Sequence, residues 1–264
     1  MGVDPTARFE ALVQGPEPAI PLDELTLLVG AHAEPGLDIS RWLGALDDIA
    51  GRCSDHSFAG LLRHLSIEGF AGNRNDYYDP RNSYLHHVIG RRAGIPITLS
   101  VVTIEIGRRL GVPVVGVGLP GHFLVRDALD EYSFGDPFDG RLLDREGCER
   151  TLAETQPELS FDVGYLAPVG TRSIVARLLA NLKGIHLARR DRRALAWVLG
   201  LRVAIPGVPL EERRELASAL AADGRFLEAA VVLDHLTGLA RDAGEGGMAE
   251  DAERGATRMR ARLN

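Results

Sequence analysis

A histidine and an aspartate, His122 and Asp136, lie in two short segments that flank one predicted turn. The segments are residues 121–126 (GHFLVR) and 134–138 (FGDPF). If the turn is centred on Leu129, antiparallel pairing puts residue 122 opposite residue 136, with Cβ atoms about 4.5 to 5.5 Å apart. A carboxylate that faces an imidazole fixes its tautomer and raises its basicity. The pair therefore offers two members of a triad for hydrolysis or acyl transfer, and the nucleophile must come from elsewhere.

Thr98 and Ser100 are the candidate nucleophiles, at the start of a helix predicted over residues 96–110. An alcohol is far less acidic than a thiol of pKa ~8.5, and a helix N-terminus supplies only about 0.3 to 1 kcal/mol. Either hydroxyl would need His122 as a general base and an oxyanion hole. Water is the other candidate nucleophile. Hydrogen bonding at the helix start explains both hydroxyls without catalysis.

Structural explanations compete with catalysis for the other polar residues too. His122 could be a buried histidine bonded to a carboxylate, and Asp136 could simply begin the turn at residues 136–140 (DPFDG). Cys53 and Cys148 are more typical of small buried apolar side chains than of reactive thiols.

The densest cluster of polar and aromatic side chains lies within residues 73–82. It is predicted to border a cleft over the start of the helix that begins at residue 96. Its side chains could stack on and hydrogen-bond to a peptide or small ligand. Arg126 shares a strand face with His122 by the period of two, so it could bind a carboxylate there or pair with a neighbouring acid. The proposed cleft residues are Asn75, Tyr77, Tyr78, Asn82 and Arg126.

Composition excludes several function classes. A net charge of −7 argues against broad binding to nucleic-acid phosphates. No apolar run approaches the ~18 residues that span a bilayer, and the first residues lack a signal-peptide pattern, so a cytoplasmic location is expected. His86 and His87 are adjacent on a predicted helix and are expected to face different directions, which argues against a metal site. We expect no cofactor, and the sequence does not indicate the oligomeric state.

The predicted elements indicate an α+β fold in three parts. Residues 1–70 are expected to be helical, residues 71–166 to add an antiparallel sheet, and residues 167–264 to be helical again. AWVL at residues 196–199 recurs as AVVL at residues 230–233, an offset of 34 residues that is typical of tetratricopeptide repeats. The strands are predicted at 112–119, 122–126 and 131–134, and the last helices at 173–188, 193–203, 210–222 and 226–239.

Four segments together resemble bacterial transglutaminase-like proteins of the SirB-one type. They are residues 73–85 (NRNDYYDPRNSYL), 91–100 (RRAGIPITLS), 119–126 (LPGHFLVR) and 136–138 (DPF), and the resemblance runs from about residue 22 to 239. It implies a papain-like transglutaminase core, in which a helix carrying the nucleophile packs on an antiparallel sheet carrying His and Asp. In active transglutaminases a cysteine opens that helix, whereas residues 96–100 (PITLS) contain none. The resemblance therefore implies loss of the cysteine nucleophile.

The sequence thus favours a transglutaminase-like protein that recognises a peptide or protein without covalent chemistry. The alternative is a hydrolase or acyltransferase acting on amide or acyl bonds, with Thr98, Ser100 or water as nucleophile and the pair His122 and Asp136 as base and orienting group.

Overall fold

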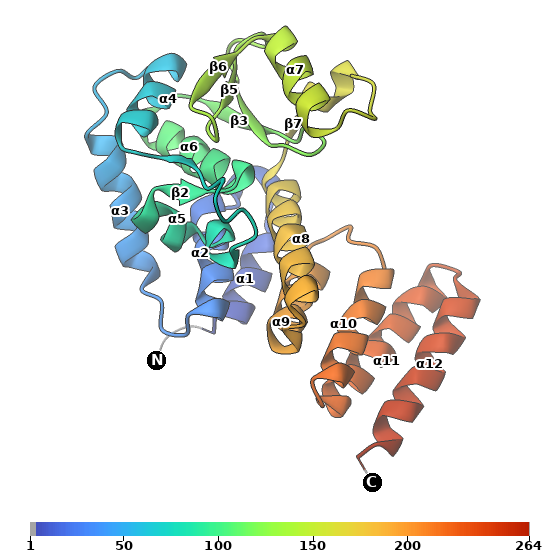
Figure 1. Cartoon of the computed structure of the whole chain (residues 1–264). Helices are drawn as coiled ribbons and strands as arrows, with labels where there is room; N and C mark the ends of the chain where they lie inside the picture. The colour runs from blue at the N-terminus through green and yellow to red at the C-terminus, as the bar shows by residue number, and fades with distance from the viewer. Residues whose placement is uncertain (1–3, 264) are drawn as a thin grey trace. The chain divides into compact units, whose positions relative to one another are not determined.

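Helices precede an antiparallel sheet, and further helices follow it (Figure 1). The computed structural model describes residues 4–263. The chain forms two compact units, one up to residue 178 and one from residue 179, so the division falls within α8 (Thr171–Arg189). The first unit has the mixed helix-and-sheet architecture that the sequence predicted. The expected boundaries at residues 70 and 166 stay predictions.

Three helices near the start of the first unit, α1, α3 and α4, begin at side chains that cap them. Asp4, Asp38 and Ser57 each accept a hydrogen bond from a backbone N–H in the first turn of the following helix. The helices that precede the first strand are α1 (Pro5–Val13), η1 (Glu17–Ala19), α2 (Leu22–Ala33), α3 (Ile39–Gly51) and α4 (Phe58–Ile67).

Helix α6 (Pro96–Leu110) is the central helix of the first unit. It has the predicted bounds, because Pro96 occupies its first turn and Gly111 ends it in the left-handed conformation at φ 72°. Its first turns are apolar on nearly every face, which is typical of a buried helix. It contacts β3 (Val114–Val117) and β4 (Leu124–Asp127) as well as helices α2, α3 and α4.

Short elements lead into α6. The strands β1 (Ala71–Gly72) and β2 (Ala93–Gly94) have two residues each and pair in parallel, and β2 immediately precedes α6. Between them lie a single 3₁₀ turn, η2 (Pro80–Ser83), and the helix α5 (Leu85–Arg91). Asp79 caps η2, but the turn does not continue directly into a longer helix because Tyr84 is extended.

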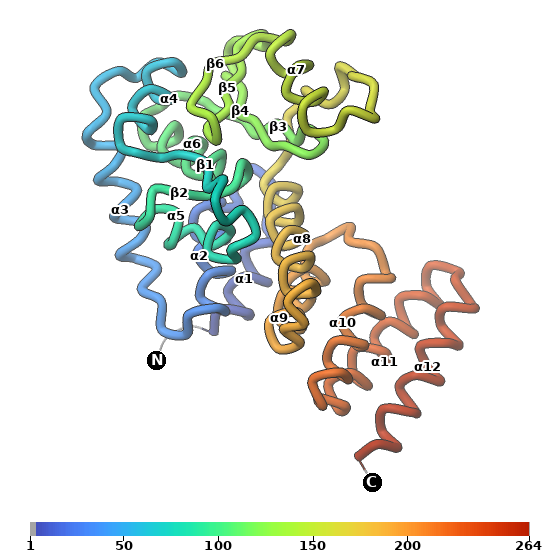
Figure 2. Tube along the Cα trace, in the orientation of Figure 1, coloured from blue at the N-terminus to red at the C-terminus, as the bar shows by residue number. Residues whose placement is uncertain are grey.

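The main sheet has the strand order β6-β5-β4-β3-β7, and all neighbouring strands in it are antiparallel. Figure 2 labels β3, β4, β5 and β6 of this sheet. Its strands are shorter than predicted. Helix α7 (Arg145–Thr155) follows β6 and packs Cys148 and Leu152 into an apolar core with Phe134 and Leu124. The remaining elements are β5 (Phe134–Asp136), β6 (Arg141–Leu143), η3 (Val163–Leu166) and β7 (Pro168–Val169).

The pairing register of β4 with β5 differs from the prediction by two residues. Val125 pairs with Gly135 and Arg126 with Phe134, so the connection is centred on Asp130 rather than Leu129. The Asp127 and Asp130 side chains accept the backbone N–H groups of Leu129 and Tyr132, which lengthens the turn. Residue 122 is therefore not directly opposite residue 136.

The second unit is helical. Successive helices contact one another from α9 to α12, around a core that includes Leu199, Leu220 and Leu236. The starts of alternate helices are 34 residues apart for α9 and α11, at residues 192 and 226, and 35 apart for α10 and α12, at residues 211 and 246. None of the helices between residues 4 and 263 combines the length and apolar character that would let it cross a bilayer. The helices are α9 (Arg192–Ala204), α10 (Glu211–Ala222), α11 (Phe226–Asp242) and α12 (Gly246–Ala261).

Candidate functional site

His122 lies in a fixed loop immediately before β4. Gly121 has φ 72°, a conformation that favours glycine, and a Cβ there would come within 2.7 Å of the Gln156 side chain. The Arg177 guanidinium donates hydrogen bonds of 2.6 Å to the carbonyl oxygens of both Leu119 and His122. The loop conformation that presents His122 is thus held by a glycine and by an arginine from a distant part of the sequence.

Asp136 ends β5, where its two carboxylate oxygens have different partners. Oδ1 accepts the backbone N–H groups of Phe138 at 3.0 Å and Asp139 at 3.4 Å, which forms the turn predicted there. Oδ2 lies 3.0 Å from Nε2 of His122 and 3.7 Å from the Arg141 guanidinium. Burial alone would raise the pKa of the Asp136 carboxyl, but His122 and the two backbone N–H groups hold it below its usual value.

The contact between His122 and Asp136 is close but not aligned as a hydrogen bond. Within residues 4–263, His122 Nε2 and Asp136 Oδ2 have no partner with hydrogen-bond geometry, although both atoms are buried. The His122 residue is 9% exposed and Asp136 is fully buried. Because the carboxylate faces Nε2, Nδ1 is the ring nitrogen left to act on a ligand.

A cleft of about 460 Å³ opens at this pair. It brings together the segment before η2, the start of α6, the His122 loop, the turn after β5 and the last turns of α7. The lining residues are Arg74, Tyr77, Tyr78, Pro96, Gly121, His122, Asp136, Phe138, Asp139, Arg141, Thr151, Glu154 and Thr155.

Aromatic rings form one side of the cleft. Phe138 contacts His122 edge to face at 5.9 Å between ring centroids, and Tyr77 contacts Phe138 at 6.2 Å. Tyr78 packs on Tyr77 and is 73% exposed. Tyr77 and Tyr78, which the sequence predicts at the border of a cleft over α6, both line this cavity, and their role as ligand-binding residues stays a prediction.

The hydroxyls predicted as nucleophiles point away from the cleft. Thr98 is fully buried, and its Oγ1 donates to the Asn82 carbonyl at 2.7 Å and accepts the Ile95 N–H at 3.2 Å. Ser100 is also fully buried, and its Oγ lies 3.5 Å from the Phe123 carbonyl. Of the helix start at 96–100, Pro96 is the residue that lines the cleft.

Three further predicted cleft residues lie elsewhere. Asn82 is fully buried, where its side-chain amide donates to the Asp76 and Tyr77 carbonyls and so folds the connection before η2. Asn75 is exposed and does not line the cavity. Arg126 lies partly buried in β4, opposite Phe134, and does not line it either.

The two cysteines lie away from the cleft. Burial raises the pKa of the Cys148 thiol to about 12, and Cys148 lies in the core under the sheet. Cys53 is buried near the end of α3 and donates to the Asp55 carbonyl. Neither cysteine lines the cleft.

The sequence did not identify the wall that α7 contributes. Thr151 and Thr155 bond back to carbonyls of their own helix, while Glu154 is exposed at the cavity. Arg74 and Arg141 both pair with Asp139 at the opposite border. The cap at Asp144 signals this helix in the sequence, but nothing local signals that its last turns reach His122.

One group in the described part of the chain has the composition of a metal site. Glu34, His86 and His87 each offer a ligand atom, and these atoms lie within 4.8 Å of one another. The expectation that His86 and His87 face different directions is wrong, because their ring centroids are 4.3 Å apart. Consecutive helical residues are about 100° apart, so both rings can reach a carboxylate that approaches between them.

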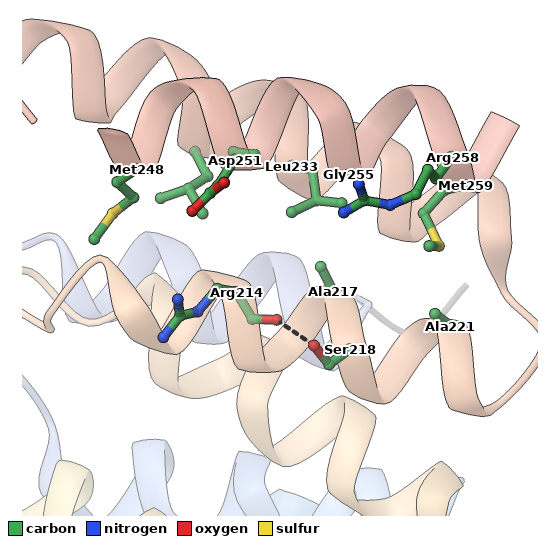
Figure 3. A pocket seen from close by; sticks show the side chains of 12 residues that line it. Arg214, Ala217, Ser218, Ala221, Leu233, Met248, Asp251, Gly255, Arg258 and Met259 are labelled. Atoms are coloured by element: carbon green, nitrogen blue, oxygen red, sulfur yellow. Dashed lines mark hydrogen bonds between the residues drawn. The ribbon is translucent and has the colours of Figure 1, made fainter. Parts of the chain in front are cut away.

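The second unit contains a groove of about 580 Å³ between α10 and α12, with α11 as its floor (Figure 3). Met259 of α12 lies across from Ala221 of α10, and Met248 lies at the end of the groove where Arg214 is. Its described lining contains no histidine or cysteine, and its polar side chains are those of Arg214, Ser218, Asp251 and Arg258.

Comparison with known proteins gives one family. A family model described as the transglutaminase-like superfamily matches residues 41–180. A UPF0162 protein of Xylella fastidiosa is 45% identical over 141 residues, which cover 51% of this chain and 50% of the relative. A UPF0162 protein of Pseudomonas aeruginosa is 35% identical over 187 residues, which cover 70% of this chain and 67% of that protein.

A relative of another kind is F-box only protein 21 of Homo sapiens, which is 35% identical over 132 residues, 46% of this chain and 20% of that protein. The matched region spans about half the length of the Xylella relatives. No solved structure matches the chain.

Proposed function

The chain belongs to the transglutaminase-like superfamily, and from this premise we propose that the cleft at His122 and Asp136 binds a peptide or protein segment non-covalently. The observation that carries the proposal is the identity of the residue at which α6 opens onto the cleft. That residue is Pro96, which has no group able to attack a carbonyl. The resemblance to active transglutaminases implies a cysteine at this helix opening.

The cleft offers groups that suit a peptide. Tyr77, Tyr78 and Phe138 present ring faces and edges for side chains, and aromatic residues are enriched where proteins bind peptides. His122 and Asp136 supply hydrogen-bonding atoms for a backbone amide. Binding a peptide requires an apolar wall and a few fixed polar groups, and the cleft has both without a nucleophile.

The coverage of the relatives supports the proposal that the matched region is a module found within longer chains. The matched region is a fifth of F-box only protein 21 and about half of the Xylella relatives. We propose that the same region acts here as a recognition module of the SirB-one type, joined to a tetratricopeptide-like tail in a cytoplasmic protein. The recurrence of helix starts at residues 192 and 226 supports the tail assignment.

Hydrolysis of an amide or acyl bond by water is the second candidate. It is favoured by the contact between His122 and Asp136, which would orient the imidazole as a general base, and by the exposed Glu154 on the opposite wall. Thr98 and Ser100 are weaker candidates as nucleophiles, because their hydroxyls are buried and do not line the cleft.

A peptide-display selection tests the proposal with a matched pair of tyrosine variants. Tyr78→Ala removes an exposed ring that lines the cleft, and Tyr132→Ala removes one that is 70% exposed and outside it. Peptides enriched on the wild-type chain should bind Tyr78→Ala at least about tenfold more weakly, in line with the loss of an aromatic anchor, and Tyr132→Ala equally well.

The mass of each recovered peptide separates the two candidate functions. Peptides that return intact after prolonged incubation support recognition. Cleavage that disappears in His122→Ala would establish the hydrolase instead. Equal binding to both tyrosine variants, or no enrichment over an unrelated protein of similar charge, would contradict a peptide site in this cleft.

A further inference from the structure

The C-terminus of α2 meets the first turn of α5 at three side chains with ligand chemistry. Glu34 caps α2, while His86 and His87 follow the first residue of α5. Glu34 Oε2 lies 3.4 Å from His86 Nε2, and Glu34 Oε1 lies 2.6 Å from His87 Nε2. Two imidazoles and one carboxylate are therefore arranged around a common point, with the same ring nitrogen of each histidine turned toward it.

His86 supplies an independent sign that this point holds a ligand. The residue is 1% exposed, yet within residues 4–263 neither of its ring nitrogens has a partner with hydrogen-bond geometry, although Nε2 faces the Glu34 carboxylate at 3.4 Å. Buried polar groups without partners are rare, because they lose their hydrogen bonds to water and gain none in return. The ring is also tightly seated, since a Cβ at Gly30 would come within 2.5 Å of its Nδ1.

We propose that Glu34, His86 and His87 bind a divalent transition-metal ion of the zinc class. Imidazole nitrogen with one carboxylate suits Zn²⁺ and its neighbours, and does not suit Mg²⁺ or Ca²⁺, which prefer oxygen ligands. Bonds of about 2.0 to 2.2 Å in a tetrahedral site put ligand atoms roughly 3.4 Å apart. The separation of Glu34 from His86 already fits, and that from His87 needs a small rotation of the Glu34 side chain, which is 47% exposed.

Three protein ligands leave one tetrahedral position for water. The ion would join the end of α2 to α5, two elements that are already in contact. Helix α5 leads through β2 into Pro96, the cleft residue at the start of α6. The ion would therefore brace the elements behind the cleft and take no part in chemistry within it. This inference does not depend on the proposed peptide binding.

Zinc competition on the full chain tests the site. Metal-free protein is titrated with Zn²⁺ in the presence of a chromophoric chelator, and thermal unfolding is followed with and without the ion. The wild-type chain should bind one equivalent and show a higher Tm with Zn²⁺, whereas Mg²⁺ should leave Tm unchanged.

The variants are chosen so that folding is preserved. Glu34→Gln and His87→Gln change side chains that are 47% and 27% exposed, and each should weaken Zn²⁺ binding by at least about tenfold. The exposed His235, in the second unit, provides the matched control, and His235→Gln should bind as the wild type does. Absence of saturable binding by the wild type, or equal affinity in Glu34→Gln, His87→Gln and His235→Gln, would overturn the proposal and leave an ion pair only.

Discussion

The Asp136 carboxylate reconciles two interpretations that the sequence presented as alternatives. One oxygen holds the turn that follows β5, and the other faces the imidazole of His122. A carboxylate can accept several hydrogen bonds on its two oxygens, so turn formation and imidazole orientation do not compete. The turn in fact fixes the direction of Oδ2, because the backbone N–H groups on Oδ1 lock the side-chain torsions. Structural and functional explanations of a residue are therefore not exclusive at this site.

Replacing Asp136 by Asn tests the charge while keeping an oxygen for the turn. We expect a loss of about 1–3 kcal/mol in the free energy of unfolding at pH 7, because a buried charged partner of His122 is removed. The folded-state pKa of Asp136 lies below its unfolded value of about 3.9. Its stabilisation is therefore present above that pH and disappears as the pH falls through the lower folded value.

Urea unfolding at pH 7 and pH 3 measures this difference. Asp130→Asn is the control, since Asp130 also accepts a turn N–H but is exposed, and it should change stability by less than about 0.5 kcal/mol. A variant at position 136 that matches the wild type at pH 7 would mean that the carboxylate charge does not stabilise the fold.

Helix α6 shows which features of an element the sequence determines locally. Its start at Pro96 and its end near Leu110 follow from the sequence, because proline at the start and glycine at the end act within a few residues. Which of its faces meets the cleft was not predicted, since a helix that is apolar on nearly every side has no polar stripe to mark one. Residue type alone points to Thr98 and Ser100, whereas the residue of this helix start that lines the cleft is Pro96.

The strands give the complementary case. The pairing register of β4 with β5 depends on how the Asp127 and Asp130 side chains lengthen the connection between these strands. A turn centred on Leu129 leaves out this extra length. His122 Nε2 and Asp136 Oδ2 nevertheless lie 3.0 Å apart, since a shift of two residues keeps strand side chains on their original faces. The assignment of this pair as a catalytic dyad stays a prediction. Arg177 and the wall from α7 depend on tertiary contacts, so local sequence patterns do not indicate them.

A cysteine placed at the opening of α6 tests which residue occupies the nucleophile position. Pro96→Cys should react with iodoacetamide at least about tenfold faster than Thr98→Cys, because the first thiol opens into the cleft near the helix N-terminus and His122. Mass spectrometry of the labelled peptide gives the rate, and circular dichroism verifies that both variants fold. Faster labelling of Thr98→Cys would mean that the buried hydroxyl position, not Pro96, faces the cleft.

At the scale of the whole chain, the spacing of apolar residues predicts the helices of the second unit but does not indicate what those helices do. The apolar spacing anticipated helices α9 to α11 within a few residues, because each helix buries one stripe against its neighbours. The division within α8 has no sequence signal, since the helix runs through it without a proline or a turn. The buried core of the second unit is drawn from residues of that unit, which gives it a stability that can be tested separately.

The two tryptophans make that test possible, because Trp42 lies in the first unit and Trp197 in the second. Leu236 is fully buried in the core of the second unit, so Leu236→Ala should lower the free energy of unfolding reported by Trp197 by about 2–5 kcal/mol. Leu227→Ala, on the same helix but 60% exposed, should change it by less than about 0.5 kcal/mol. Trp42→Phe and Trp197→Phe backgrounds isolate the two fluorescence signals in urea. Equal shifts of both signals in Leu236→Ala would mean that the units unfold as one, because separate cores predict a smaller change at Trp42.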